Sequence, residues 1–205
     1  MFAYNGVALM GDAVRAVAGV RAGLTVASTL RNETRPEHVR TEAAFAGFDL
    51  STHRGYALFL QAQASAFLAV ERSLEVAGVG AVIDDWADRR RSALLRADLA
   101  ELEVGDVTLQ PPPSFDCEAH LVGGVYVLEG SRLGGKLLRT QVPSNAPVRF
   151  LSAAGEPGSW RTFLHSLDHR LSGPSDIRLA VEAARRVFHS FEQAGRETVE
   201  RCVAR

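Results

Sequence analysis

The chain of 205 residues is poor in cysteine and lysine, with only Cys117 and Cys202 of the first and Lys136 of the second. Two cysteines are too few for a disulfide scaffold or a four-cysteine metal site, and they indicate the reduced thiols of a cytoplasmic protein. A net charge of −1 argues against a general nucleic-acid-binding protein, which is usually basic. No stretch approaches ~18 uninterrupted apolar residues, so we expect no membrane span.

The hydrophobic residues make up 46% of the chain, which is enough for one globular core. Residues 1–27 are rich in apolar side chains, but Asp12, Arg15 and Arg21 interrupt the continuous apolar stretch that a signal peptide needs. We therefore interpret residues 1–27 as an N-terminal extension and residues 28–205 as one domain.

Most of the domain carries helical patterns. In the segment 51–78 apolar residues recur at spacings of eight, three and four, as one face of a helix requires. The sequence predicts further helices, a stiff proline connector and a loop: helices over 84–102, 160–171 and 176–202, the connector at 111–113 and the loop over 143–158. The arginines at 89–91 are expected to point outward. The one short strand candidate is 125–128, so we predict an all-α fold.

The segment 30–42 brings a histidine, a carboxylate and two arginines to one side of a helix. At about 100° per residue, four side chains fall within a sector about 60° wide: Arg31, Arg35, His38 and Glu42. A metal-bound histidine uses one ring nitrogen for the metal and donates from the other to a carboxylate, as Glu42 could accept one turn after His38. The arginines could hold anionic groups through paired hydrogen bonds. An exposed helix with ordinary ion pairs is the alternative that this segment alone leaves open.

The start of this helix has two solutions. The segment from Thr34 to Glu37 has the sequence of a capping box with Pro36 in the first turn, which would leave Arg31 outside the helix. A helix that runs from about Ser28 would instead be kinked at Pro36. The pairing of the histidine with the later carboxylate is the same in both.

The segment 123–135 has five glycines in thirteen residues. In a helix each would cost ~0.5–1 kcal/mol relative to alanine, so such a helix needs a reason for its bare backbone. Gly123, Gly130 and Gly134 would share one helical face. Three interpretations stay open: a close contact between two helices, a loop after a short strand ending at Leu128, and a bent helix over a planar ligand. The segment is neither a dinucleotide-binding fingerprint nor a P-loop, because it lacks the glycine and lysine spacings of both.

Taken together, the segments 30–42 and 124–135 resemble the haem oxygenase family, in particular its bacterial, biliverdin-producing branch associated with bacteriophytochromes. The first segment looks like the family's proximal helix and the second like its distal helix, and a looser similarity covers roughly residues 28–195. The resemblance implies a single-domain helical bundle with haem between these two helices.

The resemblance also implies which side chains contact haem. His38 would bind the haem iron, and Glu42 would orient the histidine through its other ring nitrogen. The remaining cofactor-binding positions would be Arg31 and Arg35 near the haem propionates, Tyr126 as a phenol of the pocket, and Gly135.

The implied catalytic positions are on the distal helix: Gly130, Ser131 and Gly134. The two glycines would let the backbone approach the site of O₂ above the iron. Ser131 stands where the animal enzymes carry an aspartate that holds the catalytic waters, so the group that organises those waters here is an open question.

The activity implied is the O₂- and electron-dependent cleavage of haem to biliverdin, CO and ferrous iron. A separate ferredoxin or reductase would supply the electrons, and a bacteriophytochrome is a candidate acceptor of the biliverdin. The alternative is a non-catalytic bundle of the same fold that carries haem or binds a partner protein. Ser131 and the unmatched residues 1–27 keep that alternative open.

Overall fold

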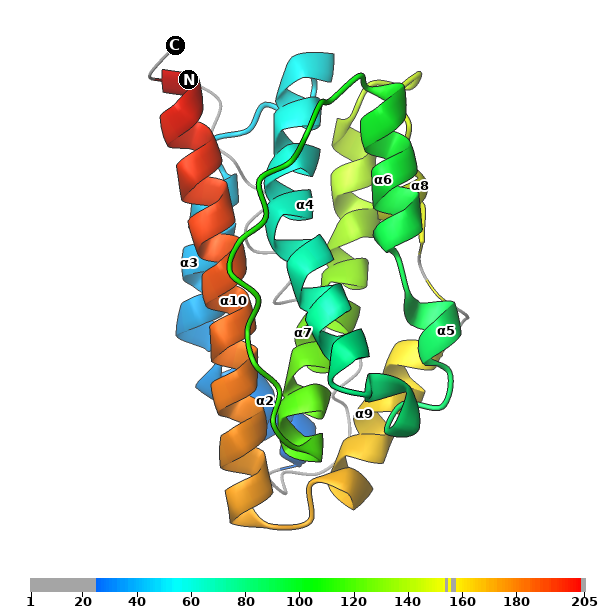
Figure 1. The fold of residues 1–205 in the computed structure, drawn as a ribbon, viewed down its shortest axis with the longest axis vertical. Helices are drawn as coiled ribbons and strands as arrows, with labels where there is room; N and C mark the ends of the chain where they lie inside the picture. Colours follow the sequence, from blue (N-terminus) through cyan, green and yellow to red (C-terminus); the bar gives the residue numbers. More distant parts are fainter. Residues whose placement is uncertain (1–24, 154, 156–157, 204–205) are drawn as a thin grey trace.

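The computed structural model describes residues 25–153, 155 and 158–203 (Figure 1). Across these ranges the regular structure is helical and contains no strand, so the predicted all-α fold is confirmed. Residues 1–24 of the expected extension lie outside the described residues. The last part of that extension, Val26 and Ala27, belongs to the first described helix, α2 (Val26–Glu33).

Helices of very different lengths and two 3₁₀ turns follow α2 along the described part of the chain. They are α3 (Arg35–Phe45), α4 (His53–Val76), the 3₁₀ turn η1 (Val79–Ala81), α5 (Trp86–Arg89), α6 (Ser92–Glu101), α7 (Glu118–Leu138), the 3₁₀ turn η2 (Arg139–Gln141), α8 (Arg149–Ser152), α9 (Ser159–Arg170) and α10 (Pro174–Val203). No helix within the described ranges is long and apolar enough to cross a bilayer.

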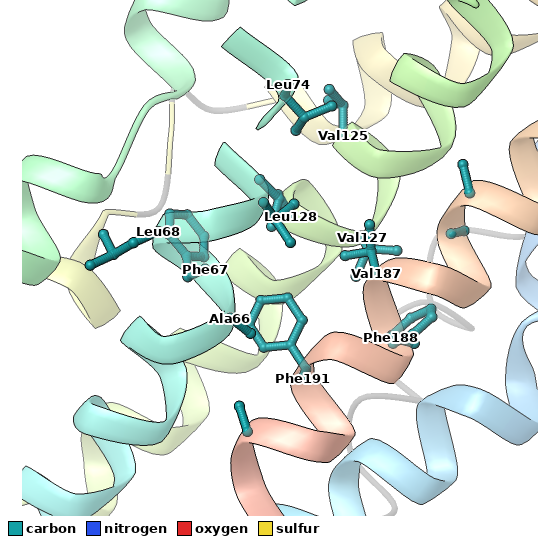
Figure 2. Close-up of a cluster of buried hydrophobic side chains, with 14 of the residues drawn as sticks. Ala66, Phe67, Leu68, Leu74, Val125, Val127, Leu128, Val187, Phe188 and Phe191 are labelled. Atoms are coloured by element: carbon teal, nitrogen blue, oxygen red, sulfur yellow. The ribbon is translucent and has the colours of Figure 1, made fainter. Parts of the chain in front are cut away.

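The last helix, α10, is central to the bundle. It is 30 residues long and packs against α3 on one side and against α4 and α7 on the other (Figure 1). Apolar side chains of α4, α7 and α10 meet in the core, among them Phe67, Leu128 and Phe191 (Figure 2). Burial of this surface, at about 25 cal/mol per Å², is the main force that joins the three helices.

The proline connector is extended and is tied to two helices that it passes. The Ser73 hydroxyl on α4 donates a hydrogen bond of 2.6 Å to the carbonyl oxygen of Pro113. The Gln110 side-chain amide donates to Glu197 of α10 at 2.8 Å. These contacts bring the chain from α6 back to the start of α7 without a further helix.

The junction of α2 and α3 combines the two predicted solutions. The chain is helical from Val26, is interrupted at Thr34, and becomes helical again with Pro36 in the first turn of α3. The predicted capping box is wrong, because the Thr34 side chain makes no cap hydrogen bond. Its hydroxyl instead donates to the carbonyl oxygen of Leu30 at 2.7 Å. Arg31 therefore lies in α2 and His38 in α3.

The predicted helix 84–102 is divided into α5 and α6. Glu71 of α4 is 2% exposed, and its carboxylate accepts the backbone N–H groups of Arg91 at 2.8 Å and Ser92 at 2.9 Å. Since this carboxylate satisfies the first N–H groups of a helix, α6 begins at Ser92.

The predictions of a strand at 125–128 and of a loop over 143–158 need correction. The strand candidate 125–128 lies within α7, so the glycine-rich segment is helical. The predicted loop 143–158 contains the short helix α8. The carboxylate of Asp98, which is fully buried, accepts the N–H of Phe150 at 2.8 Å and so holds the start of α8 against α6.

The first glycines of α7 allow close packing. A Cβ atom at Gly123 would overlap with the backbone carbonyl of Ala180 in α10, and a Cβ at Gly124 would lie 2.6 Å from the ring of Phe115. At Gly130 a Cβ would lie 3.8 Å from the Trp160 ring, which is an ordinary contact distance. The close-contact interpretation therefore holds at the start of α7 and does not extend to Gly130.

These distances predict opposite effects of one substitution at two positions of α7. Gly123→Ala should lower the free energy of unfolding by ~1–3 kcal/mol, because the methyl group forces α7 away from α10. Gly130→Ala is the matched control and should raise it by up to ~1 kcal/mol, since alanine favours helix and has room there. Urea unfolding of the protein without added ligand checks both values. Equal stabilities of the two variants would contradict the assignment of Gly123 to the helix contact.

Candidate functional site

The predicted pair of His38 and Glu42 is formed on α3. Nδ1 of His38 lies 3.6 Å from Oε2 of Glu42, and the histidine side chain is 30% exposed. The edge of the ring packs against Phe188 of α10, with 5.6 Å between the ring centroids. A carboxylate beside Nδ1 favours the tautomer with the proton on that nitrogen. In this tautomer Nε2 carries the lone pair that can bind a metal ion.

Helix α3 is fixed to α10 by two residues that follow this histidine. The Thr41 hydroxyl donates to the carbonyl oxygen of Phe188 at 3.1 Å. Nε of Arg40 donates to the buried carboxylate of Glu192 at 3.2 Å. Helix α10, which packs against α7, therefore also sets the position of His38.

One stripe of α7 is only partly buried, although most of the helix is buried. The stripe consists of Tyr126, Gly130, Leu133 and Gly134. The Tyr126 ring lies 5.7 Å from that of Trp160 in α9, centroid to centroid. The stripe therefore combines bare backbone at its glycines with an aromatic border on the side of α9.

Gly135 has a packing explanation that differs from its predicted contact with a cofactor. A Cβ atom there would lie 3.0 Å from the carbonyl oxygen of Leu151 in α8, and the residue is buried. The close approach of α8 therefore accounts for this glycine.

The two predicted arginines lie in different surroundings. Arg31 is partly buried in α2, and its charge acts on the phenol of Tyr126 in α7. Arg35 is exposed at the first position of α3. The charge of Arg31 therefore acts on one residue of the half-buried stripe, and Arg35 lies one turn before His38.

Ser131 has its hydroxyl directed to protein groups. The Oγ atom donates to the carbonyl oxygen of Leu128 at 2.7 Å. It also accepts a hydrogen bond of 2.7 Å from Nη2 of Arg91, which reaches α7 from the turn before α6. The sequence did not indicate Arg91 as a residue of the site. The prediction that its side chain points outward is wrong, because Arg91 is 3% exposed.

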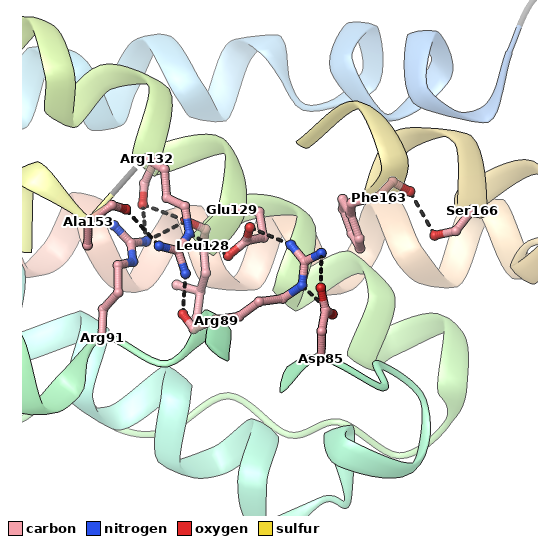
Figure 3. Close-up of polar contacts among 10 residues, drawn as sticks. Asp85, Arg89, Arg91, Leu128, Glu129, Arg132, Ala153, Phe163 and Ser166 are labelled. Carbon is pink, nitrogen blue, oxygen red and sulfur yellow. Dashed lines mark hydrogen bonds and ion pairs between the residues drawn. The ribbon is translucent and has the colours of Figure 1, made fainter. Parts of the chain in front are cut away.

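Arg89 is also buried, again contrary to the outward prediction, and it belongs to an ionic network between α5 and α7 (Figure 3). Glu129 is 3% exposed and accepts from Arg89 at 2.6 Å and from Arg132 at 2.7 Å. Arg89 also binds Asp85 of the preceding turn, and Arg132 donates to the carbonyl oxygen of Ala153 at 2.7 Å. The network thus joins α5, α7 and the segment after α8. Of the three arginines at 89–91, Arg90 alone is exposed as predicted.

Comparison with known proteins places the chain in a family. No protein-family model matches the sequence. The chain is 33% identical over 112 residues to a heme oxygenase of Xanthomonas campestris pv. campestris (strain 8004), a match that spans 52% of this chain and 67% of that protein. The chain therefore belongs to the haem oxygenase family.

A solved structure supports the fold. The crystal structure of the NO- and CO-bound heme oxygenase from Neisseria meningitidis is similar with a TM-score of 0.69 and 23% sequence identity. The similarity covers 86% of this chain and 92% of that chain. The helical bundle described above is thus the haem oxygenase fold.

The half-buried stripe gives a prediction that depends on pH. Burial raises the pKa of Tyr126 to about 12 from an ordinary value of 10.0, while the charge of Arg31 acts in the opposite direction. The folded-state pKa is the higher one, so the stabilisation is complete below the unfolded value and is lost as the pH rises through the folded value.

We therefore expect Tyr126→Phe, which cannot ionise, to lose less stability than the wild type between roughly pH 10 and 12. Urea unfolding at a series of alkaline pH values checks this difference. Parallel loss of stability in the two proteins would show that the Tyr126 phenol ionises as easily in the folded chain as in the unfolded one.

Proposed function

We propose that this member of the family is an active haem oxygenase, which uses O₂ and electrons to cleave haem to biliverdin, CO and ferrous iron. The observation that carries the proposal is the pair of His38 and Glu42 on α3. Imidazole nitrogen is a common axial ligand of haem iron, and a carboxylate on the other nitrogen fixes the ring and raises its basicity. The bare backbone at Gly130 supports it, because a flat substrate needs a face without side chains.

The residues present fit haem as a substrate. His38 would hold the iron through Nε2, and Glu42 would keep the imidazole in the required tautomer. The backbone of α7 at Gly130 and Gly134 would cover the face of the porphyrin opposite to His38. Bound haem supplies both the iron that activates O₂ and the porphyrin that is cut.

The charged and aromatic groups around the stripe would orient the ring. Arg31 and Arg35 would bind the carboxylates of the propionates, since guanidinium groups recognise carboxylates in a bidentate manner. Tyr126 would border the pocket as a neutral phenol, since even its ordinary pKa of 10.0 lies well above neutral pH. The propionate contacts would decide which meso carbon is placed for cleavage.

The reaction also needs partners that the family resemblance suggests. Electrons would come from a separate ferredoxin or reductase in the cytoplasm, and a bacteriophytochrome is a candidate acceptor of biliverdin. These partners belong to the proposal together with the membership in the bacterial branch associated with bacteriophytochromes.

Addition of haemin to the purified protein, followed by an electron donor in air, tests the activity. We expect a Soret band that decays to the spectrum of a bilin, with release of CO. A stable Soret band under the same conditions would favour the non-catalytic carrier of the same fold.

The variant His38→Ala tests the iron ligand in that assay. It should abolish turnover because the axial bond is lost, and added imidazole should restore part of it. Glu42→Gln should lower turnover by roughly 10-fold, because the ring loses the charged partner that orients it. His53→Ala is the control, since His53 is an exposed histidine at the start of α4. Wild-type turnover by His38→Ala without imidazole would overturn the ligand assignment.

A further inference from the structure

Arg91 is a buried cation with an unusual set of partners. Its side chain is 3% exposed and packs against the rings of Phe67 and Phe150, with its guanidinium carbon 4.8 and 4.9 Å from the two centroids. The guanidinium donates to the carbonyl oxygen of Leu128 at 2.6 Å and to Oγ of Ser131 at 2.7 Å, and both acceptors are uncharged. Its Nε is buried without a hydrogen-bond partner among the described residues.

The neighbouring arginines differ from Arg91 in this respect. Arg89 and Arg132 both bind the carboxylate of Glu129, as buried cations generally require. Burial lowers the pKa of Arg91 to about 9, and the charge of Arg132 acts in the same direction, while Glu129 and Glu71 act against it. The group is therefore still charged at neutral pH, although its hydrogen bonds go to neutral oxygens of α7.

These hydrogen bonds determine whether the Ser131 hydroxyl can donate or accept a further hydrogen bond. A serine hydroxyl has one hydrogen to donate and two lone pairs to accept with. The hydrogen is directed to Leu128, and one lone pair receives the guanidinium N–H of Arg91. Ser131 is partly exposed, so the oxygen can present only its remaining lone pair to a group outside the helix. Without Arg91 the hydroxyl would be able to rotate and to donate instead.

The same guanidinium acts on the backbone of α7. The carbonyl oxygen of Leu128 receives two side-chain donors, Arg91 and Ser131. Side-chain donors on a helix carbonyl compete with the main-chain N–H four residues later and favour bending at that turn. Gly130 lies within this turn, at the part of α7 that the proposed function places over the substrate.

We propose that Arg91 is a positioning residue for haem cleavage, which holds the Ser131 hydroxyl as a hydrogen-bond acceptor beside Gly130 on α7. The role rests on the proposed function, because it needs haem beside Gly130. Arg91 does not touch the substrate and acts through Ser131.

A double-mutant cycle with Arg91→Met and Ser131→Ala tests this role. Methionine preserves an unbranched side chain against the two phenylalanine rings and removes the hydrogen bonds. Arg90→Met is the matched control, since Arg90 is the adjacent arginine and is exposed. The readouts are haem turnover and the C–O stretching frequency of the CO complex, which reports the polar groups on the substrate side independently of turnover.

We expect each single variant to shift the C–O frequency and to lower turnover by roughly 10-fold, as loss of outer-shell partners does. In the Ser131→Ala background, Arg91→Met should add little further change, because the group through which it acts is absent. The Arg90→Met control should match the wild type in both readouts.

Several results would overturn the proposal. Additive effects of the two substitutions would show that Arg91 acts independently of Ser131, and a change in melting temperature alone would show a purely structural role. If Arg91→Met does not fold, Arg91→Lys takes its place, because lysine keeps the charge but its shorter side chain has no nitrogen at the position of Nη2, which donates both hydrogen bonds. Unchanged readouts in that variant would also contradict the role. A wild-type protein that neither binds nor cleaves haem would overturn the proposed function itself, and the positioning role with it.

Discussion

The close approach of α7 to α10 at Gly123 is the constraint on which the rest of the structure depends. Because no side chain separates the two backbones there, α10 can lie along α7 and still bury the core side chains of α4. The same α10 carries α3 through the hydrogen bond of Thr41 to Phe188. One helix therefore sets the position of His38 and the position of the glycine-rich helix at once.

The other side of α7 is held by buried charges. Glu129 lies between Arg89 and Arg132, and Arg91 donates to the carbonyl oxygen of Leu128 in the same turn of the helix. Removal of one partner of such a buried pair typically costs ~3–5 kcal/mol, which is comparable with the helix propensity that five glycines sacrifice. Apolar packing on one side and ionic contacts on the other thus hold a helix of low intrinsic stability in place.

Local patterns in the sequence were sufficient for part of the fold and of the candidate site. The pairing of His38 with Glu42 was predictable because it depends only on one turn of a helix, and the all-α fold followed from helical periodicity. Interactions between distant segments were not predictable in this way. The bond of Arg91 to Ser131 joins residues 40 positions apart, and composition alone makes an arginine run look exposed. The break between α5 and α6 was missed for the same reason, since it depends on Glu71 in another helix.

The crystal structure of the protein with haem bound would test the central claim most directly. We expect the iron to be bound to a ring nitrogen of His38, with the other nitrogen toward Glu42. We also expect the opposite face of the porphyrin to lie against α7 at Gly130. Iron bound by a different residue, or a porphyrin that does not lie between α3 and α7, would contradict the claim.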